Sequence, residues 1–291
     1  MKTITIPSSI KTVESDAFYG TSVERIDIHD LNAWMKIDFE AYSLGYEDDD
    51  AHPGCGGKAE LYLNGEIVRE VIVPDDITEL DDMAFLGIES LTNVVCHDNV
   101  KRVGSRAFYS CGQLNECVLP KREETFTLGT RLFCFCASLS KINLPENASC
   151  ISAHMFQGTG LTSISIPSSV KRIYDYAFYQ CNKLTEMHIP EGVEMLYARS
   201  FSNCSNLEIV SLPSTLSYIG PDAFTDCVNL NTVFLASPIP STVSDSSFSG
   251  CDSLTIFVPY EQIDSYRSDI HWASYAHRIV GYDFENDKVV E

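Results

Sequence analysis

The stretch Leu161-Thr-Ser-Ile164-Ser-Ile166-Pro167-Ser-Ser-Val170-Lys-Arg-Ile173-Tyr-Asp-Tyr-Ala177-Phe178-Tyr-Gln-Cys181 decides the fold, because its pattern recurs along most of the chain. Eight phenylalanines mark successive copies at intervals of 22 to 25 residues, and Phe18 stands 67 residues before the first of them. They are Phe85, Phe108, Phe133, Phe156, Phe178, Phe201, Phe224 and Phe248. Self-similarity at a fixed period of this length is the sequence signature of a solenoid.

One copy reads as a short strand followed by a turn and a second apolar segment. Ile164 and Ile166 alternate with serines, which is the period of a half-buried strand. The proline that follows ends the strand, because proline has no N–H to donate to the ladder. Val170 and Ile173 return along the opposite wall, and the ring of Phe178 fills the interior. Such a unit cannot bury its apolar face alone, so the copies must stack.

We therefore predict a β-rich solenoid, a parallel coil with repeats of about 23 residues and short second-wall strands. It covers residues 1–259 and contains an irregular inserted segment at residues 29–67. Within that segment, Asn64-Gly65 between alternating apolar residues predicts a hairpin, and Trp34, Ile37 and Phe39 repeat the strand spacing.

Residues 260–291 leave the repeat and are rich in aromatic side chains. A stack of coils needs a terminal element that covers its open end. We expect this stretch to be a C-terminal cap, made by Tyr260, Tyr266, Trp272, Tyr275 and Tyr282.

The composition limits the partners of the chain. It carries 41 acidic and 20 basic residues, a formal net charge of −21, which opposes binding to nucleic acid and to anionic membranes. Apolar residues make up 44% of the sequence, which is enough for a folded core. No apolar run approaches the roughly 18 residues that a membrane span needs. The strong negative charge favours a soluble monomer.

A column of cysteines accompanies the phenylalanines. In six copies a cysteine stands three residues after the Phe, whereas Thr21, Ile88 and Thr159 hold that place in the others. A position that accepts Cys, Thr or Ile is a buried place for a small side chain and is unsuited to a metal. We expect thiols that face the turn backbone. Disulfides between neighbouring coils are the alternative.

No motif predicts chemistry, so we expect no catalytic residue, cofactor or metal site. The acidic residues Glu47 to Asp50 are contiguous, whereas an EF-hand places its ligands at alternating positions. We interpret residues 45–58 as an exposed loop; its Gly54-to-Lys58 stretch lacks the spacing of a phosphate loop. The seven histidines show no paired spacing, and no G-x-S-x-G motif occurs. The sequence therefore favours a protein that is not an enzyme.

Outward positions of the repeated strand give the candidate site. Stacking aligns these positions into one face, and several are more apolar than exposure to water requires. We predict a partner-binding surface that contains Ile72, Val95, Val118, His188, Ile209 and Phe234. The alternative is that β-branched residues simply suit strands, or that the inserted segment covers part of the face.

The repeated pattern Leu-x-x-Ile-x-Ile-Pro-x-x-Val-x-x-Ile-x-x-x-Ala-Phe-x-x-Cys resembles the BspA-like leucine-rich repeats, also called the Treponema pallidum type. The resemblance covers nearly the whole chain and implies a right-handed solenoid found mostly on secreted or cell-surface bacterial proteins. Some members act as adhesins that bind host matrix proteins or other cells. The family has no shared catalytic residue to place on this chain.

The leading hypothesis is a protein-binding module of a bacterial surface, extracellular or displayed on the cell, that binds a host matrix or neighbouring-cell protein. One alternative is a carbohydrate-binding module that uses Tyr109, Tyr179 and Tyr218 or the aromatic tail. Another is a cytoplasmic scaffold, because the chain is rich in thiols and its first residues lack the apolar core of a signal peptide. An export signal upstream of Met1 would decide between surface and cytoplasm.

Overall fold

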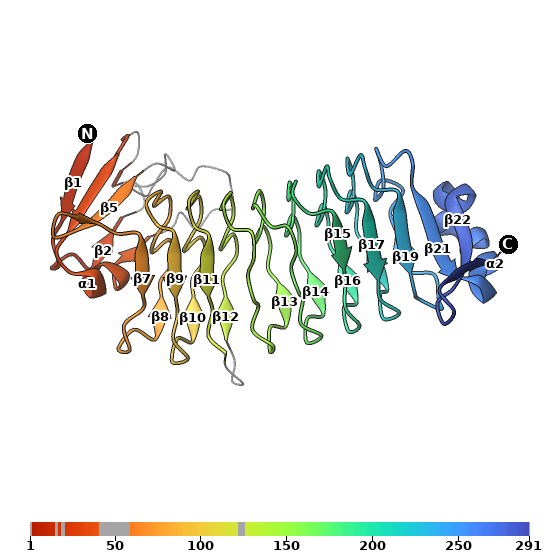
Figure 1. The fold of residues 1–291 in the computed structure, drawn as a ribbon, viewed down its shortest axis with the longest axis horizontal. Helices are drawn as coiled ribbons and strands as arrows, with labels where there is room; N and C mark the ends of the chain where they lie inside the picture. Colours follow the sequence, from red (N-terminus) through yellow and green to blue (C-terminus); the bar gives the residue numbers. More distant parts are fainter. Residues whose placement is uncertain (1, 15–16, 19–20, 41–58, 122–125, 291) are drawn as a thin grey trace. The chain divides into compact units, whose positions relative to one another are not determined.

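The computed structural model describes the chain except residues 1, 15–16, 19–20, 41–58, 122–125 and 291. The predicted acidic loop at residues 45–58 lies outside the described residues. The chain divides into two compact units, which we describe one at a time. The first comprises Met1–Pro145 with Gly158–Gly160, and the second comprises Glu146–Gln157 with Leu161–Glu291. Both units consist of parallel coils, as Figure 1 shows, which confirms the predicted solenoid. The predicted boundary between residues 259 and 260 stays a prediction.

In the first unit, the regular coils carry two walls of parallel strands (Figure 1). The first wall consists of β7 (Glu70–Ile72), β9 (Asn93–Val95) and β11 (Glu116–Val118). The second wall consists of the two-residue strands β8 (Glu79–Leu80), β10 (Arg102–Val103) and β12 (Thr127–Leu128). The short strands on the second wall are those that the sequence predicts.

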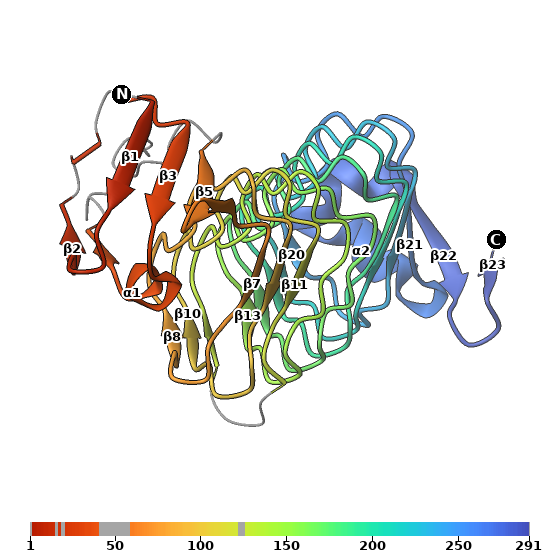
Figure 2. The same cartoon turned by 60° about the vertical axis from the view of Figure 1, so that its left-hand side comes forward.

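The N-terminal part of the first unit has its own small sheet. The strands β1 (Thr3–Ile6), β3 (Arg25–Ile28) and β5 (Glu60–Leu63) run parallel, as Figure 2 shows, and β6 (Glu66–Ile67) pairs antiparallel with β5. The hairpin between β5 and β6 confirms the prediction from Asn64-Gly65, both of which have positive φ angles. A separate pair joins β2 (Thr12–Val13) to β4 (Asp38–Phe39).

The prediction that Trp34 continues a strand pattern is wrong. Trp34 lies in α1 (Leu31–Met35), whose start is capped because the Asp30 carboxylate accepts a hydrogen bond from the Ala33 N–H at 3.0 Å. The Trp34 indole is buried and donates to the Ala84 carbonyl at 2.9 Å. This contact holds α1 against the coil that contains Phe85.

The second unit repeats the two walls. Its first wall contains β15 (Glu186–His188), β17 (Ile209–Leu212), β19 (Thr232–Leu235), β21 (Thr255–Pro259), β22 (Ile279–Asp283) and the antiparallel β23 (Lys288–Val290). Its second wall contains β13 (Cys150–Ile151), β14 (Arg172–Ile173), β16 (Met195–Leu196), β18 (Tyr218–Ile219) and β20 (Thr242–Val243). Three short helices separate β21 from β22: η1 (Tyr260–Gln262), α2 (Ile263–Ser268) and η2 (Ile270–Arg278).

A third wall surrounds each phenylalanine and contains no strand. Tyr176 and Gln180, two residues before and two after Phe178, have left-handed φ angles of 57° and 59°. The N–H groups of these three residues donate to the Ala198, Ser200 and Ser202 carbonyls of the next coil. The coils around Phe85, Phe108 and Phe201 form the same three bonds. The bonds that join neighbouring coils on this wall therefore run in one direction, from the N–H groups of one coil to the carbonyls of the following coil.

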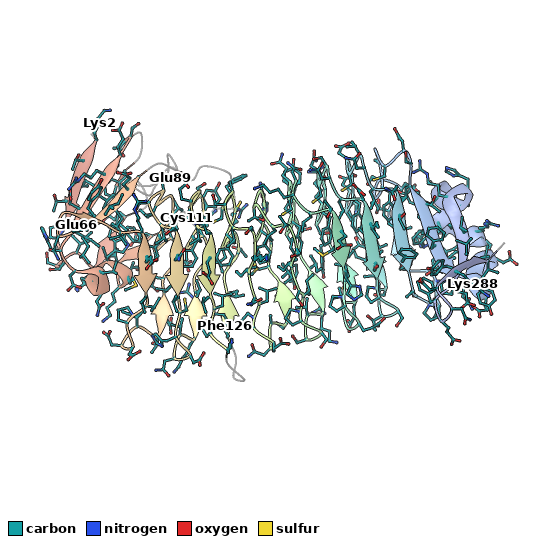
Figure 3. The ribbon with its side chains drawn as sticks, in the orientation of Figure 1. Lys2, Glu66, Glu89, Cys111, Phe126 and Lys288 are labelled. Atoms are coloured by element: carbon teal, nitrogen blue, oxygen red, sulfur yellow. The ribbon has the colours of Figure 1, made fainter. Side chains whose placement is uncertain are left out.

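The interior of each unit is a stack of rings beside a column of thiols. Phe85, Phe108 and Phe133 stack at 5.9 and 5.7 Å between ring centroids in the first unit. The Cys111 thiol, labelled in Figure 3, donates to the Phe85 carbonyl at 3.0 Å, and Cys136 donates to Phe108 in the same way. In the second unit the same bonds join Cys181 to Phe156, Cys204 to Phe178, Cys227 to Phe201 and Cys251 to Phe224. These bonds confirm thiols that face the turn backbone.

Candidate functional site

In the first unit, a solvent-exposed apolar row crosses the first wall. Ile72, Val95 and Val118 lie in register on β7, β9 and β11. Their side chains are 73%, 39% and 37% exposed, whereas the alternate residues Val71 and Val94 are buried. Three predicted site residues therefore form one continuous row on adjacent strands. We call this set the apolar row.

A second row, with two glutamates and one asparagine, runs beside the apolar row, and we call it the acidic row. Glu70, Asn93 and Glu116 precede its members by two residues, and residues two apart on a strand share a face. Glu70 and Glu116 are exposed, and no hydrogen bond or ion pair joins either carboxylate to another described residue. By contrast, Asp27 on β3 has its pKa lowered because its carboxylate bonds to the Arg25 guanidinium. The acidic row is thus available to a cationic partner.

In the second unit, the other three predicted site residues lie on the first wall. His188, Ser211 and Phe234 are in register on β15, β17 and β19. Ile209 precedes Ser211 by two residues, so it shares their face, and its side chain is 38% exposed. The structure therefore brings His188, Ile209 and Phe234 onto one sheet face.

The Phe234 ring packs against three other aromatic rings of the second unit. Its ring centroid lies 5.2 Å from that of Phe257, 5.0 Å from that of Tyr282 and 6.5 Å from that of Phe284. Phe284 follows β22, so the C-terminal hairpin reaches back to the face of β19. Sequence reasoning missed Tyr282 and Phe284 as members of this face because both residues lie outside the repeat. Phe257 continues the outward column of Phe234 and could have been found from the alternation on β21.

The carbohydrate alternative uses Tyr109, Tyr179 and Tyr218, and the two of them that belong to the second unit, Tyr179 and Tyr218, do not form one platform. Each of the three rings packs edge-on against a neighbouring ring, at centroid distances of 5.5 to 6.2 Å. Tyr109 belongs to the first unit and meets Phe135. In the second unit, Tyr179 follows Phe178 on the third wall, whereas Tyr218 lies on β18 of the second wall.

We next consider metal ligands and nucleophilic thiols among the described residues. No group of three or more His, Cys, Asp or Glu side chains among them could hold a metal ion. Burial raises the pKa of the Cys96 thiol to about 12, and it raises the pKa of Cys117 and Cys136 as well. Such thiols hold little nucleophilic thiolate near neutral pH. No helix in the described part of the chain is long and apolar enough to cross a membrane.

Comparisons with known proteins agree with the geometry. The sequence model of the BspA type leucine-rich repeat region matches residues 1–44, 59–185 and 171–275 in 6 copies. The crystal structure of a leucine-rich repeat protein from T. pallidum is 30% identical over 56% of this chain and 81% of that one, with a TM-score of 0.51. A leucine-rich repeat protein from Eubacterium ventriosum is 21% identical over 86% of this chain and 64% of that one, with a TM-score of 0.49.

A leucine-rich repeat protein from Bacteroides ovatus is 18% identical and has a TM-score of 0.46. The alignment covers 65% of this chain and 63% of that one. No curated protein matches the sequence.

Proposed function

The chain belongs to the BspA-type leucine-rich repeat family, and from that membership we propose that it is a protein-binding module of a bacterial surface. Repeats of this kind generally mediate protein binding, and solenoids of this kind are generally not catalytic. Proteins of the family are typically secreted or displayed on the cell. The proposed role is adhesin-like, and the partner is a host matrix protein or a protein of a neighbouring cell.

The observation that carries the proposal is the apolar row of the first unit. Contiguous exposed apolar surface often marks a site where another protein binds. An extended sheet surface also suits a macromolecule better than a small substrate. The net charge of −21 favours partners with neutral or basic surfaces and disfavours sulfated or sialylated glycans.

Binding to an immobilised panel of extracellular-matrix and mucin proteins tests the proposal. We expect at least one panel protein to bind, and we expect Ile72→Asp and Val95→Asp to weaken that binding at least tenfold. Val289→Asp is the control, because Val289 is 54% exposed on β23 and belongs to a different sheet, in the second unit. Failure of every panel protein to bind would count against the adhesin role. If binding is unchanged by the substitutions in the apolar row, the partner binds at another surface of the protein.

Surface display needs a separate test, because a binding module can work in any compartment. Antibodies against the purified protein should label intact cells of the source bacterium or detect the protein in the medium. Labelling only after the cells are broken open would favour the cytoplasmic scaffold.

A further inference from the structure

We propose that the apolar row binds a basic amphipathic α-helix of the partner protein, with the helix axis along the row and across the strands. This inference rests on the proposed function and deepens it, because it specifies the secondary structure and the charge of the bound segment. Three features of the first unit carry it: the spacing of the row, its length, and the charges on either side.

The spacing of the apolar row fits a helix. Neighbouring strands lie about 4.8 Å apart, so Ile72, Val95 and Val118 repeat at about that distance across the sheet. Side chains at i, i+3 or i+4, and i+7 of a helix repeat every ~5 Å along its axis. An extended peptide repeats its same-face side chains every ~6.8 Å and loses register within two steps. The row therefore matches apolar residues on one side of a helix.

The length of the row sets the length of the contact. The residues of the next coil that correspond to Glu116 and Val118 are Lys141 and Asn143, so both the negative charge and the apolar character stop there. Three apolar side chains on adjacent strands span about 10 Å. This distance equals about two helical turns, or the separation of residues i and i+7.

The charges beside the row favour basic residues along one side of the helix. The carboxylates of Glu70 and Glu116, which have no hydrogen-bond or ion-pair partner among the described residues, stand two strands apart, about 10 Å, on one side of the apolar row. A Lys or Arg pair at i and i+7 would reach both. On the other side, the residues two positions after the row are Pro74, His97 and Pro120, which carry no negative charge. The His97 ring bonds to the Pro74 carbonyl at 2.9 Å.

Three synthetic peptides of about 18 residues, two of them able to form a helix, test the proposal by fluorescence titration. The first carries Leu at i, i+4 and i+7 with Arg along one side. The second has Glu in place of each Arg, and the third has the composition of the first with two central prolines that prevent a helix. We expect the first peptide to bind the intact protein at least tenfold more tightly than either of the others.

Variants of the protein test whether the first peptide binds at the apolar row. Ile72→Asp should abolish binding of the first peptide, and Glu70→Lys combined with Glu116→Lys should reverse the preference toward the acidic peptide. Glu285→Lys and Val289→Asp serve as charge and polarity controls, since both residues are exposed in the C-terminal hairpin. Circular dichroism confirms that each variant is folded.

The outcomes separate the helix proposal from the proposed function. Equal binding of the three peptides to the intact protein would overturn the helix and charge preference. Absence of binding by all three would overturn the helix proposal too. In either case, a matrix or mucin protein whose binding is lost with Ile72→Asp would leave the protein-binding function standing.

Discussion

Ser200 and Ser247 occupy the same place in two coils, directly before a stacked phenylalanine, yet their hydroxyl groups differ. Most coils have Ala at this place, as at Ala177 and Ala223. The Ser247 hydroxyl donates to the Gly220 carbonyl at 2.8 Å. The Ser200 hydroxyl is fully buried and has no hydrogen-bond partner within the part of the chain that the structure describes. A buried polar group without a partner costs about 1–3 kcal/mol.

We expect Ser200→Ala to raise the free energy of unfolding by about 1 kcal/mol, because the substitution removes an unsatisfied hydroxyl. Ser247→Ala should lower it by about 1 kcal/mol, because the Ser244 N–H loses the hydroxyl that accepts its hydrogen bond and the Gly220 carbonyl loses one of its two donors. Urea unfolding followed by circular dichroism measures both values. A loss of stability in Ser200→Ala would contradict the assignment of its hydroxyl as unsatisfied.

The buried thiols predict a loss of stability in alkaline solution. Burial raises the pKa of Cys96 to about 12, above the value of about 8.5 in an unfolded chain. The folded state therefore holds this proton longer than the unfolded state. The stabilising effect is complete below about pH 8 and is lost as the pH rises toward 12.

Between pH 8 and pH 10, the free energy of unfolding of the protein should fall more than that of a Cys96→Ala variant, by about 1–2 kcal/mol. Urea unfolding at each pH, with a reductant present, gives the two slopes. Parallel pH profiles would show that Cys96 does not contribute.

At the scale of an element, the third wall depends on left-handed residues that are mostly not glycine. Gln180 has a φ of 59° and is exposed, whereas Gly250, at the same place two residues after Phe248, has a φ of 78°. A Cβ atom at Gly250 would lie 2.8 Å from an Asp226 carboxylate oxygen. The left-handed conformation costs an L-residue roughly 1–2 kcal/mol, which glycine avoids.

We expect Gln180→Gly to raise the melting temperature slightly, corresponding to about 0.5–1 kcal/mol after the entropy cost of glycine is subtracted. Gly250→Ala should lower the free energy of unfolding by about 1–2 kcal/mol, because it adds the backbone penalty. Differential scanning calorimetry compares the two variants with the unchanged protein. The opposite order of stabilities would show that backbone conformation does not govern this wall.

The elements that the sequence predicts are those whose pattern follows the period. The alternation around Ile164 predicts the first wall, Val170 and Ile173 predict the second, and Asn64-Gly65 predicts a hairpin. The third wall could not be predicted, because Tyr176 and Gln180 carry no signal for a left-handed backbone. Trp34 lies in a helix and not in the predicted strand, because the capping bond of Asp30 outweighs a short alternation.

For the candidate site, the sequence predicts which residues face outward but not which of them remain uncovered. Ile72 and Phe234 hold equivalent outward places in their coils. Ile72 is open to solvent, whereas Phe234 is packed by Phe257 and the C-terminal hairpin. The difference comes from Tyr282 and Phe284, which pack against Phe234. Both residues follow the last repeat, so the repeated pattern does not predict this contact.

At the scale of the whole molecule, the last coil of a stack needs a terminal element that covers it. In the second unit, the Phe248 N–H of the last coil donates to the Tyr275 hydroxyl at 3.3 Å. That hydroxyl also bonds to the Ser244 and Asp245 carbonyls, at 3.1 and 2.7 Å. We propose that residues 260–291 are a cap in which Tyr275 replaces the carbonyl of a further coil.

Tyr275→Phe should lower the free energy of unfolding by about 1–3 kcal/mol, because it leaves the buried Phe248 N–H without an acceptor. Hydrogen exchange of the Phe248 amide should become faster in this variant. Tyr260→Phe is the control, since Tyr260 is exposed on η1. Unchanged exchange at Phe248 would exclude the hydroxyl as its partner.

On the third wall, the hydrogen bonds between coils all run from one coil to the next in the same direction. The two ends of a stack of coils therefore differ chemically. A bare first coil would offer carbonyl groups, and a bare last coil would offer N–H groups. These ends are complementary, so uncapped copies could join head to tail into open polymers. Trp34, a donor, terminates the carbonyl end at Ala84 in the first unit, and Tyr275, an acceptor, terminates the N–H end at Phe248 in the second. Each of these two side chains thus occupies, within its own unit, a backbone group that a coil of another copy would otherwise bind.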